Sequence, residues 1–145
     1  MNPARLQLPV LNTTACDIIL LLNQLLMGVL FLEGLNLAHK IIDILSDKQA
    51  TDIVLLDTQG VCSFTEYFVI SSGESTRQIK ALTSAVTDEL KKESLRPLHE
   101  EGTPETGWVL LDYNDVVVHI FSPAERDYYQ LEKLWEKACT KVRVP

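Results

Sequence analysis

Residues 107–135 constrain the fold more than any other stretch, because they read as strand, turn, strand and helix in immediate succession. Two apolar runs, residues 108–111 and 116–121, are rich in the β-branched and aromatic residues typical of strands. The short polar stretch between them fits a hairpin turn. Ser122, followed by a proline and by a glutamate three positions on, predicts a capped helix that runs to about residue 140.

The spacing of residues in this unit predicts which side chains share a face of the strand or the helix. In the second strand Val117, His119 and Phe121 share one side of the sheet, and the residues between them share the other. In the helix, residues at helical spacing predict a continuous apolar face, which consists of Tyr128, Leu131, Leu134, Trp135 and Ala138.

Upstream of this unit, helical and strand patterns alternate. Residues 35–48 repeat apolar residues at helical intervals, and Ser75 opens a second such stretch with the spacing of a capping box. Between these two stretches, residues 52–57 and 67–71 read as strands.

The stretch before the hairpin is harder to assign. Residues 95–98 predict a short edge strand, because Pro97 cannot donate to a ladder, and the acidic residues 99–106 predict a loop. The whole order predicts an α/β (α+β) fold in which helices sandwich a mixed sheet of about five strands.

Residues 1–32 differ from the rest of the chain. Residues 18–32 are strongly apolar but shorter than a membrane-spanning helix, and Asn23 and Gln24 interrupt them. Three interpretations stay open: an interfacial or partner-bound helix, a helix packed on the domain, or a segment outside the natural protein, with Met27 as an internal start. We therefore predict an N-terminal extension over residues 1–32 and a domain over residues 33–145.

The bulk properties exclude several functions. A net charge of −7 disfavours a general nucleic-acid surface and favours a basic protein partner. The three cysteines form no CxxC pair, which indicates a reducing compartment and no zinc knuckle. We expect a cytoplasmic protein that needs no metal and no cofactor.

Two features invite an enzymatic hypothesis. Residues 71–75 lie at a strand-to-helix junction, where backbone N–H groups can bind phosphate. However, the stretch lacks a phosphate-binding glycine motif, Glu74 would repel phosphate, and no strand carries the D-x-D pair of metal-dependent nucleotidyl transfer. His119 lies in mid-strand, where structural, partner-binding and catalytic roles are all open. We predict no catalytic residue.

The aromatic residues of the same unit suggest docking. An apolar ring with a polar tip is typical of the anchors of protein interfaces, although Trp108 and Trp135 also suit a core. We predict that one face of the hairpin and the adjoining helix binds a protein partner. The proposed contact residues are Trp108, Asp112, Asp115, Val117, His119, Arg126, Tyr129 and Glu132.

The patterns G-W…D-x-x-D-V-x-V-H-x-F and R-x-x-Y-x-L-E-x-L-W resemble the Iojap family, also called ribosomal silencing factors. Here their fixed positions are Gly107, Trp108, Asp112, Asp115, Val116, Val118, His119, Phe121, Arg126, Tyr129, Leu131, Glu132, Leu134 and Trp135. Two further patterns, D-I-x-x-L-D-x-x-G from Asp52 and S-G-x-S-x-R-Q from Ser72, resemble the same family. The likeness covers residues 35–137.

The resemblance implies a nucleotidyltransferase-like fold without known enzymatic activity. It implies binding to the large ribosomal subunit through its protein fourteen, which would sterically block joining of the small subunit and repress translation in starvation or stationary phase. Neither sequence-specific nucleic-acid binding nor a membrane is implied. An assembly factor on the same site, a nucleotidyltransferase-type enzyme and a homodimer are the alternatives.

Overall fold

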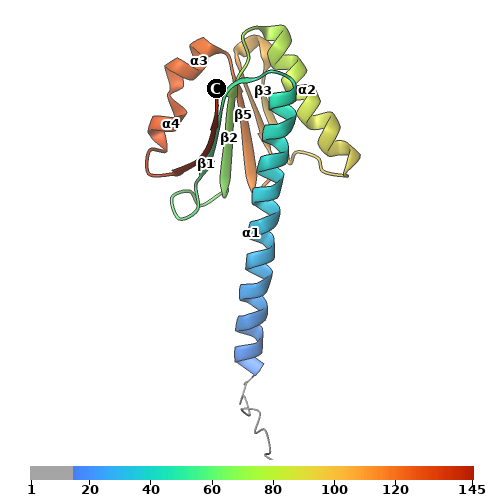
Figure 1. The fold of residues 1–145 in the computed structure, drawn as a ribbon, viewed down its shortest axis with the longest axis vertical. Coiled ribbons are helices and arrows are strands. Elements are labelled where there is room, and N and C mark those ends of the chain that lie inside the picture. Colours follow the sequence, from blue (N-terminus) through green and yellow to red (C-terminus); the bar gives the residue numbers. More distant parts are fainter. Residues whose placement is uncertain (1–14) are drawn as a thin grey trace, which may run out of the picture. The chain divides into compact units, whose positions relative to one another are not determined.

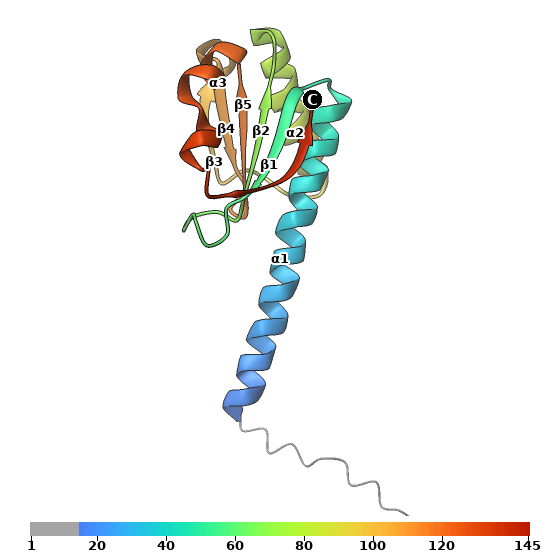
Figure 2. The same ribbon diagram turned by 60° about the vertical axis from the view of Figure 1, so that its left-hand side comes forward.

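The computed structural model describes residues 15–145, and the side chains of residues 27–32 lie outside the description. The chain divides into two compact units, Met1–Leu32 and Glu33–Pro145. The second unit contains a six-stranded mixed sheet with helices on both faces (Figures 1 and 2). The predicted α/β (α+β) fold is therefore confirmed, with one strand more than expected.

The elements follow one another along the chain with short connections. Their bounds are α1 (Ala15–Asp47), β1 (Thr51–Asp57), β2 (Tyr67–Ser72), α2 (Thr76–Lys92), β3 (His99–Thr103), η1 (Pro104–Thr106), β4 (Trp108–Asp112), β5 (Val116–Phe121), α3 (Pro123–Tyr129), α4 (Leu131–Leu134) and β6 (Cys139–Val144).

The strands lie in the order β3-β4-β5-β2-β1-β6. β2 and β5 are parallel, and the other four pairs are antiparallel. α2 carries the chain from β2 to β3 at the edge of the sheet, and two antiparallel pairings then lead back through β4 to β5. The register places Val117 beside Phe68 and Leu110 beside His119. This register brings the aromatic residues of three neighbouring strands to one face.

Each face of the sheet has its own apolar cluster. On one face, α2 and residues 33–47 of α1 cover side chains that include Ile53, Val69, Val118 and Ile120, all fully buried. On the other face, Phe68, Val117 and Phe121 are packed under Leu131 and Trp135. α3 and α4 are short, so this second cover is much smaller than the first.

Both predicted helix caps are present. The Ser75 hydroxyl accepts from the backbone N–H of Gln78 at 3.1 Å, and the Ser122 hydroxyl accepts from that of Glu125 at 3.2 Å. The Gln78 side chain accepts from the backbone N–H of Glu74, one residue before the cap itself. Short side chains at these positions satisfy helix N–H groups that have no partner in the helix.

The prediction of one helix from Pro123 to about residue 140 was wrong. The chain turns at Gln130, which has φ 44° and ψ 53°, and the helix restarts as a single turn before β6 pairs with β1. As a consequence Tyr128 and Leu134, expected on an apolar inner face, are 78% and 73% exposed. The β-branched residues that end the chain add a strand to an open sheet edge, which local helix propensity cannot anticipate.

The edge strand before the hairpin was also misplaced. Residues 95–98 form no strand, whereas residues 99–103, predicted as a loop, form β3 against β4. All five residues of β3 are exposed, so the strand carries no apolar alternation that would mark it in the sequence. Charged residues are typical of such an edge, because they discourage pairing with other chains.

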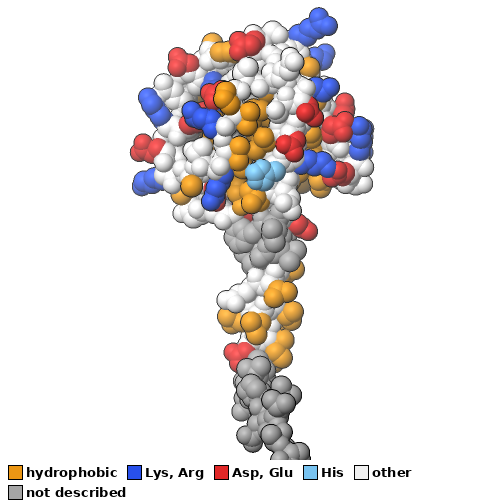
Figure 3. All heavy atoms as spheres, viewed as in Figure 1, with side chains coloured by type: hydrophobic (Ala, Val, Ile, Leu, Met, Phe, Trp, Pro, Cys, Tyr) orange, Lys and Arg blue, Asp and Glu red, His pale blue; other side chains and the backbone are white. Residues whose placement is uncertain are grey.

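The N-terminal unit is described from residue 15 onward, within α1. Its described apolar side chains are strongly exposed, from 48% at Ile18 to 70% at Leu25, and Figure 3 shows them at the surface between the grey atoms. Within the described residues, no helix is long and apolar enough to cross a membrane.

Candidate protein-docking surface

An aromatic cluster lies on the sheet face that α3 and α4 cover only in part. The indole N–H of Trp108 donates to Nδ1 of His119 at 3.2 Å. Because an indole nitrogen can only donate, Nδ1 must be the acceptor and the proton of the neutral imidazole lies on Nε2. This hydrogen bond joins β4 to β5 through their side chains.

Ring contacts extend the cluster in both directions. Trp108 stacks on Phe121, with centroids 4.9 Å apart, and contacts Tyr129 of α3 at 4.7 Å. On the other side of His119, Phe68 lies 5.1 Å away and contacts Trp135 at 5.4 Å. We call this surface, with Phe64 and Leu110 at its borders, the aromatic face.

The aromatic face is partly open to solvent. Phe64 is 63% exposed and Tyr129 47% exposed, while Trp108, Leu110 and Trp135 are half-buried. A contiguous aromatic surface of this kind is typical of sites that bind a macromolecular partner.

His119 itself is buried, so its side chain lies beneath the aromatic face, and its contact with a partner stays a prediction. Its Nε2 has no hydrogen-bond partner among the described residues, and burial lowers the pKa of the imidazole to about 3. Val117 is buried on the same face. Both side chains are covered by the aromatic rings and support the surface from beneath. The imidazole stays neutral at physiological pH.

Arg126 is also buried, and its contact with a partner stays a prediction. Its Nε and Nη2 donate to one carboxylate oxygen of Glu132, at 2.9 and 2.6 Å. Its Nη1 donates to the backbone oxygen of Asp52 at 2.6 Å and to the hydroxyl of Ser72 at 2.9 Å. This buried guanidinium fastens α3 and α4 to the ends of β1 and β2, where β1 bulges.

Asp112 and Asp115 lie at the opposite end of the hairpin. The Asp112 carboxylate accepts from the backbone N–H of Asn114 at 2.8 Å, and Asp115 accepts from the Asn114 amide at 3.0 Å. Burial raises the pKa of the Glu66 carboxyl, and the negative charges of Asp115 and Asp57 raise it further. The predicted contact residues therefore fall into three groups: Trp108, His119, Val117 and Tyr129 under or on the aromatic face, Arg126 with Glu132 at one end of the sheet, and Asp112 with Asp115 at the other.

The strand-to-helix junction at residues 71–75 functions as a helix cap. A cavity of about 480 Å³ lies there, lined by the carboxylates of Asp52, Glu74, Asp127 and Glu132 and by the cations Arg126 and Lys133. The carboxylates outnumber the cations, and Arg126 already donates to protein acceptors, so the cavity disfavours a phosphate. Among the described residues, no group of three metal-ligating side chains converges.

Sequence reasoning missed several members of the aromatic face. Phe64, Phe68 and Leu110 come from three different segments. Alternation along β5 placed Phe121 with His119. No local signal places Phe68 beside them, because that depends on the pairing of β2 with β5.

The half-open aromatic sheet face, rather than the mixed α/β fold, is the feature that protein interfaces share. The chain belongs to the ribosomal silencing factor family, because the family model described as "Ribosomal silencing factor during starvation" matches residues 33–145. The resemblance seen in the sequence motifs is thereby confirmed.

Individual relatives agree with this assignment. The ribosomal silencing factor of Bacillus subtilis is 42% identical over 92 residues, which cover 63% of this chain and 78% of that protein. The mouse protein named mitochondrial assembly of ribosomal large subunit protein 1 is 32% identical over 98 residues, which cover 66% of this chain and 43% of that protein. These names describe regulatory or assembly factors.

A solved structure shows the same fold. A crystal structure of a Chromobacterium violaceum protein superimposes with a TM-score of 0.65 at 39% identity, and covers 76% of this chain and 91% of that chain.

Proposed function

We propose that this chain binds the large ribosomal subunit through its protein fourteen and blocks joining of the small subunit by occupying their common contact surface. On this proposal it represses translation in the cytoplasm during starvation or stationary phase. The mechanism is steric occupancy, so it requires no catalytic residue and no cofactor.

The aromatic face is the observation that carries the proposal. Tyr129 and Trp108 combine a large apolar ring with a polar tip, which gives contact area at a low cost in side-chain entropy. The rings are held from beneath by His119 and Phe121, so they are already ordered before a partner arrives. A preformed surface loses less entropy on binding than a flexible one.

The net charge of the chain favours a basic ribosomal protein, rather than ribosomal RNA, as the direct partner. The chain carries a charge of −7, and proteins that bind ribosomal RNA need basic residues to neutralise phosphates. Opposite charges accelerate the encounter of two proteins and favour the correct orientation. Binding is therefore expected to weaken as the salt concentration rises.

Sedimentation through a sucrose gradient tests the proposal. The purified chain, added to purified ribosomal subunits, should co-sediment with the large subunit and reduce the fraction of joined ribosomes. The Tyr129→Ala variant, which removes an exposed ring from the aromatic face, should lose both effects. Leu95→Ala, which removes an exposed apolar side chain beyond the end of α2, is the control and should behave as wild type. If the wild-type chain neither co-sediments nor reduces joining, the proposal fails.

An assembly role on the same site is a second candidate, favoured by the name of the mouse relative. It predicts that deletion of the gene leaves immature large subunits during growth, before any starvation. Mature large subunits in the deletion strain, with excess joined ribosomes in stationary phase, would favour silencing. A homodimer through the aromatic face would compete with the ribosome, and sedimentation equilibrium of the free chain would detect it.

A further inference from the structure

The aromatic face contains a cavity beside Trp108 that is suited to a single side chain. Its volume is about 260 Å³, below the range of typical small-molecule sites. The residues that line it include Glu101, Thr106, Trp108, Leu110, Glu125 and Tyr129. They come from β3, η1, β4 and α3, so the cavity forms only when the edge of the sheet and the first turn of α3 meet.

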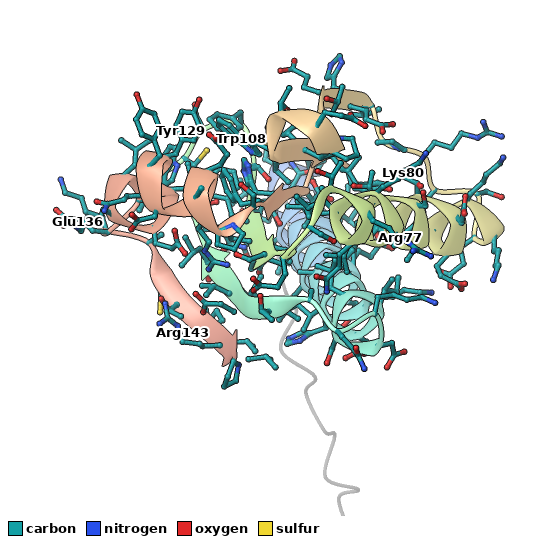
Figure 4. The ribbon with its side chains drawn as sticks, turned by 90° about the horizontal axis from the view of Figure 1, so that it is seen from above. Arg77, Lys80, Trp108, Tyr129, Glu136 and Arg143 are labelled. Atoms are coloured by element: carbon teal, nitrogen blue, oxygen red, sulfur yellow. The ribbon has the colours of Figure 1, made fainter. Side chains whose placement is uncertain are left out.

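Two aromatic rings form one part of the lining. The Trp108 and Tyr129 rings lie 4.7 Å apart at an interplanar angle of 48°. Figure 4 shows the two residues side by side, away from Arg77 and Lys80 on α2. Indole and phenol faces carry negative potential, so they attract a cation placed against them.

Two carboxylates form the other part. Glu101 is exposed on β3, and Glu125 is half-buried in the first turn of α3. The Glu125 side chain is close to Gly107, where an added Cβ would lie 2.7 Å from its Cγ. Within residues 15–145, neither glutamate has a basic side-chain nitrogen within 4.0 Å. The cavity therefore combines negative charge with π-electron-rich walls and supplies no cation of its own.

We propose that this cavity takes an arginine side chain from the basic partner. The proposal rests on the proposed function and specifies the chemistry that recognises the partner. A planar guanidinium can stack on one of the two tilted rings, Trp108 or Tyr129, and contact the other, while its N–H groups donate to Glu101 or Glu125. A lysine ammonium gains the charge but loses the stacking and the forked geometry, so arginine fits both halves of the cavity better.

Binding to the large subunit tests the carboxylates. The Glu101→Gln/Glu125→Gln variant keeps the shape of the cavity and removes both charges, and its affinity should fall about tenfold or more. Asp43→Asn/Asp88→Asn removes the same charge from exposed positions on α1 and α2 and should change the affinity by less than about twofold. Equal losses for the two variants would show that only net charge matters and would overturn the proposal.

A small probe tests the cavity without the ribosome. N-acetyl-arginine amide should shift the Trp108 indole N–H resonance saturably, and the Trp135→Phe variant identifies that resonance. N-acetyl-citrulline amide has nearly the same shape without the charge and should produce no saturable shift. Similar shifts from both probes, or none from the arginine probe, would overturn the arginine site. If wild-type chain fails to bind the subunit while the arginine titration succeeds, the proposed function fails and the site remains.

Discussion

Trp108 and His119 are joined across β4 and β5 by a hydrogen bond of 3.2 Å, in which the indole N–H donates to Nδ1 of the imidazole. The bond requires a neutral imidazole, since a protonated ring has no acceptor. Burial favours the same neutral form, and it lowers the pKa of His119 to about 3. A residue that resembles a catalytic base thus serves to hold the tryptophan of the aromatic face.

This relationship predicts a pH dependence of stability. The unfolded imidazole titrates near 6.5 and the folded one near 3, so between these values the unfolded chain binds more protons. The contribution of His119 is complete above about pH 6.5 and is lost as the pH falls, with a slope of at most about 1.4 kcal/mol per pH unit. Urea denaturation at a series of pH values should show this slope.

The His119→Asn variant should show a smaller slope below pH 6.5, because its amide oxygen can accept from Trp108 without titrating. His39→Asn changes an exposed histidine on α1 and should leave the slope as in wild type. If the free energy of unfolding of His119→Asn depended on pH as in wild type, His119 would not be a buried neutral histidine.

The Arg126 clamp predicts a large effect on stability. Arg126→Met leaves Glu132, Ser72 and the Asp52 carbonyl without their common donor, and we expect a loss of about 2–4 kcal/mol in the free energy of unfolding. Lys92→Met breaks an exposed ion pair with Glu89, which solvent screens, and should lower the free energy of unfolding far less. Chemical denaturation of both variants measures the difference, and similar small losses would contradict the clamp.

Gly60 and Gly102 have nearly equal φ angles but different surroundings, so alanine at the two positions distinguishes backbone strain from a steric clash. At Gly102, φ is 78° and an added Cβ would lie 2.0 Å from the Trp108 carbonyl oxygen. At Gly60, φ is 75° and nothing lies within 4 Å. Gly60→Ala should cost about 1–2 kcal/mol from backbone strain alone, and Gly102→Ala should cost about 2–4 kcal/mol. Equal costs by urea denaturation would mean that β3 shifts freely away from β4.

At Gln130, replacement by glycine should not destabilise the protein, which is uncommon for this substitution. Gln130 adopts a left-handed conformation, which costs a non-glycine residue about 1–2 kcal/mol. Gln130→Gly removes that strain but adds freedom to the unfolded chain, so the net change should lie between zero and a gain of about 1 kcal/mol. Lys80→Gly, at an exposed position inside α2, should instead destabilise by about 1 kcal/mol. Thermal unfolding of both variants distinguishes these outcomes.

The junction at residues 71–75 predicts weak or absent nucleotide binding. Four carboxylates line the cavity there against two cations, Arg126 and Lys133, and the Arg126 guanidinium already donates to protein acceptors. Calorimetric titration with Mg-nucleotides should give no saturable heat. Saturable binding that is lost in Arg126→Lys would revive the enzymatic alternative.

Local patterns in the sequence were sufficient to predict many features of this protein. The caps at Ser75 and Ser122, the hairpin of residues 108–121 and the alternation that groups His119 with Phe121 depend on neighbours within a few positions. The motif order identified the family, which the family model confirms. Such signals survive in the sequence because each one acts over a single turn or strand.

Only the tertiary structure showed which residues far apart in the sequence contact one another. Arg126 contacts Asp52, 74 positions away, and β6 adds to β1 at an edge that no local pattern marks. β3 is a strand because β4 supplies its partner, although every one of its side chains is exposed. The aromatic face and its acidic cavity likewise require the register of β2, β4 and β5, since strand pairing brings residues distant in sequence within contact range.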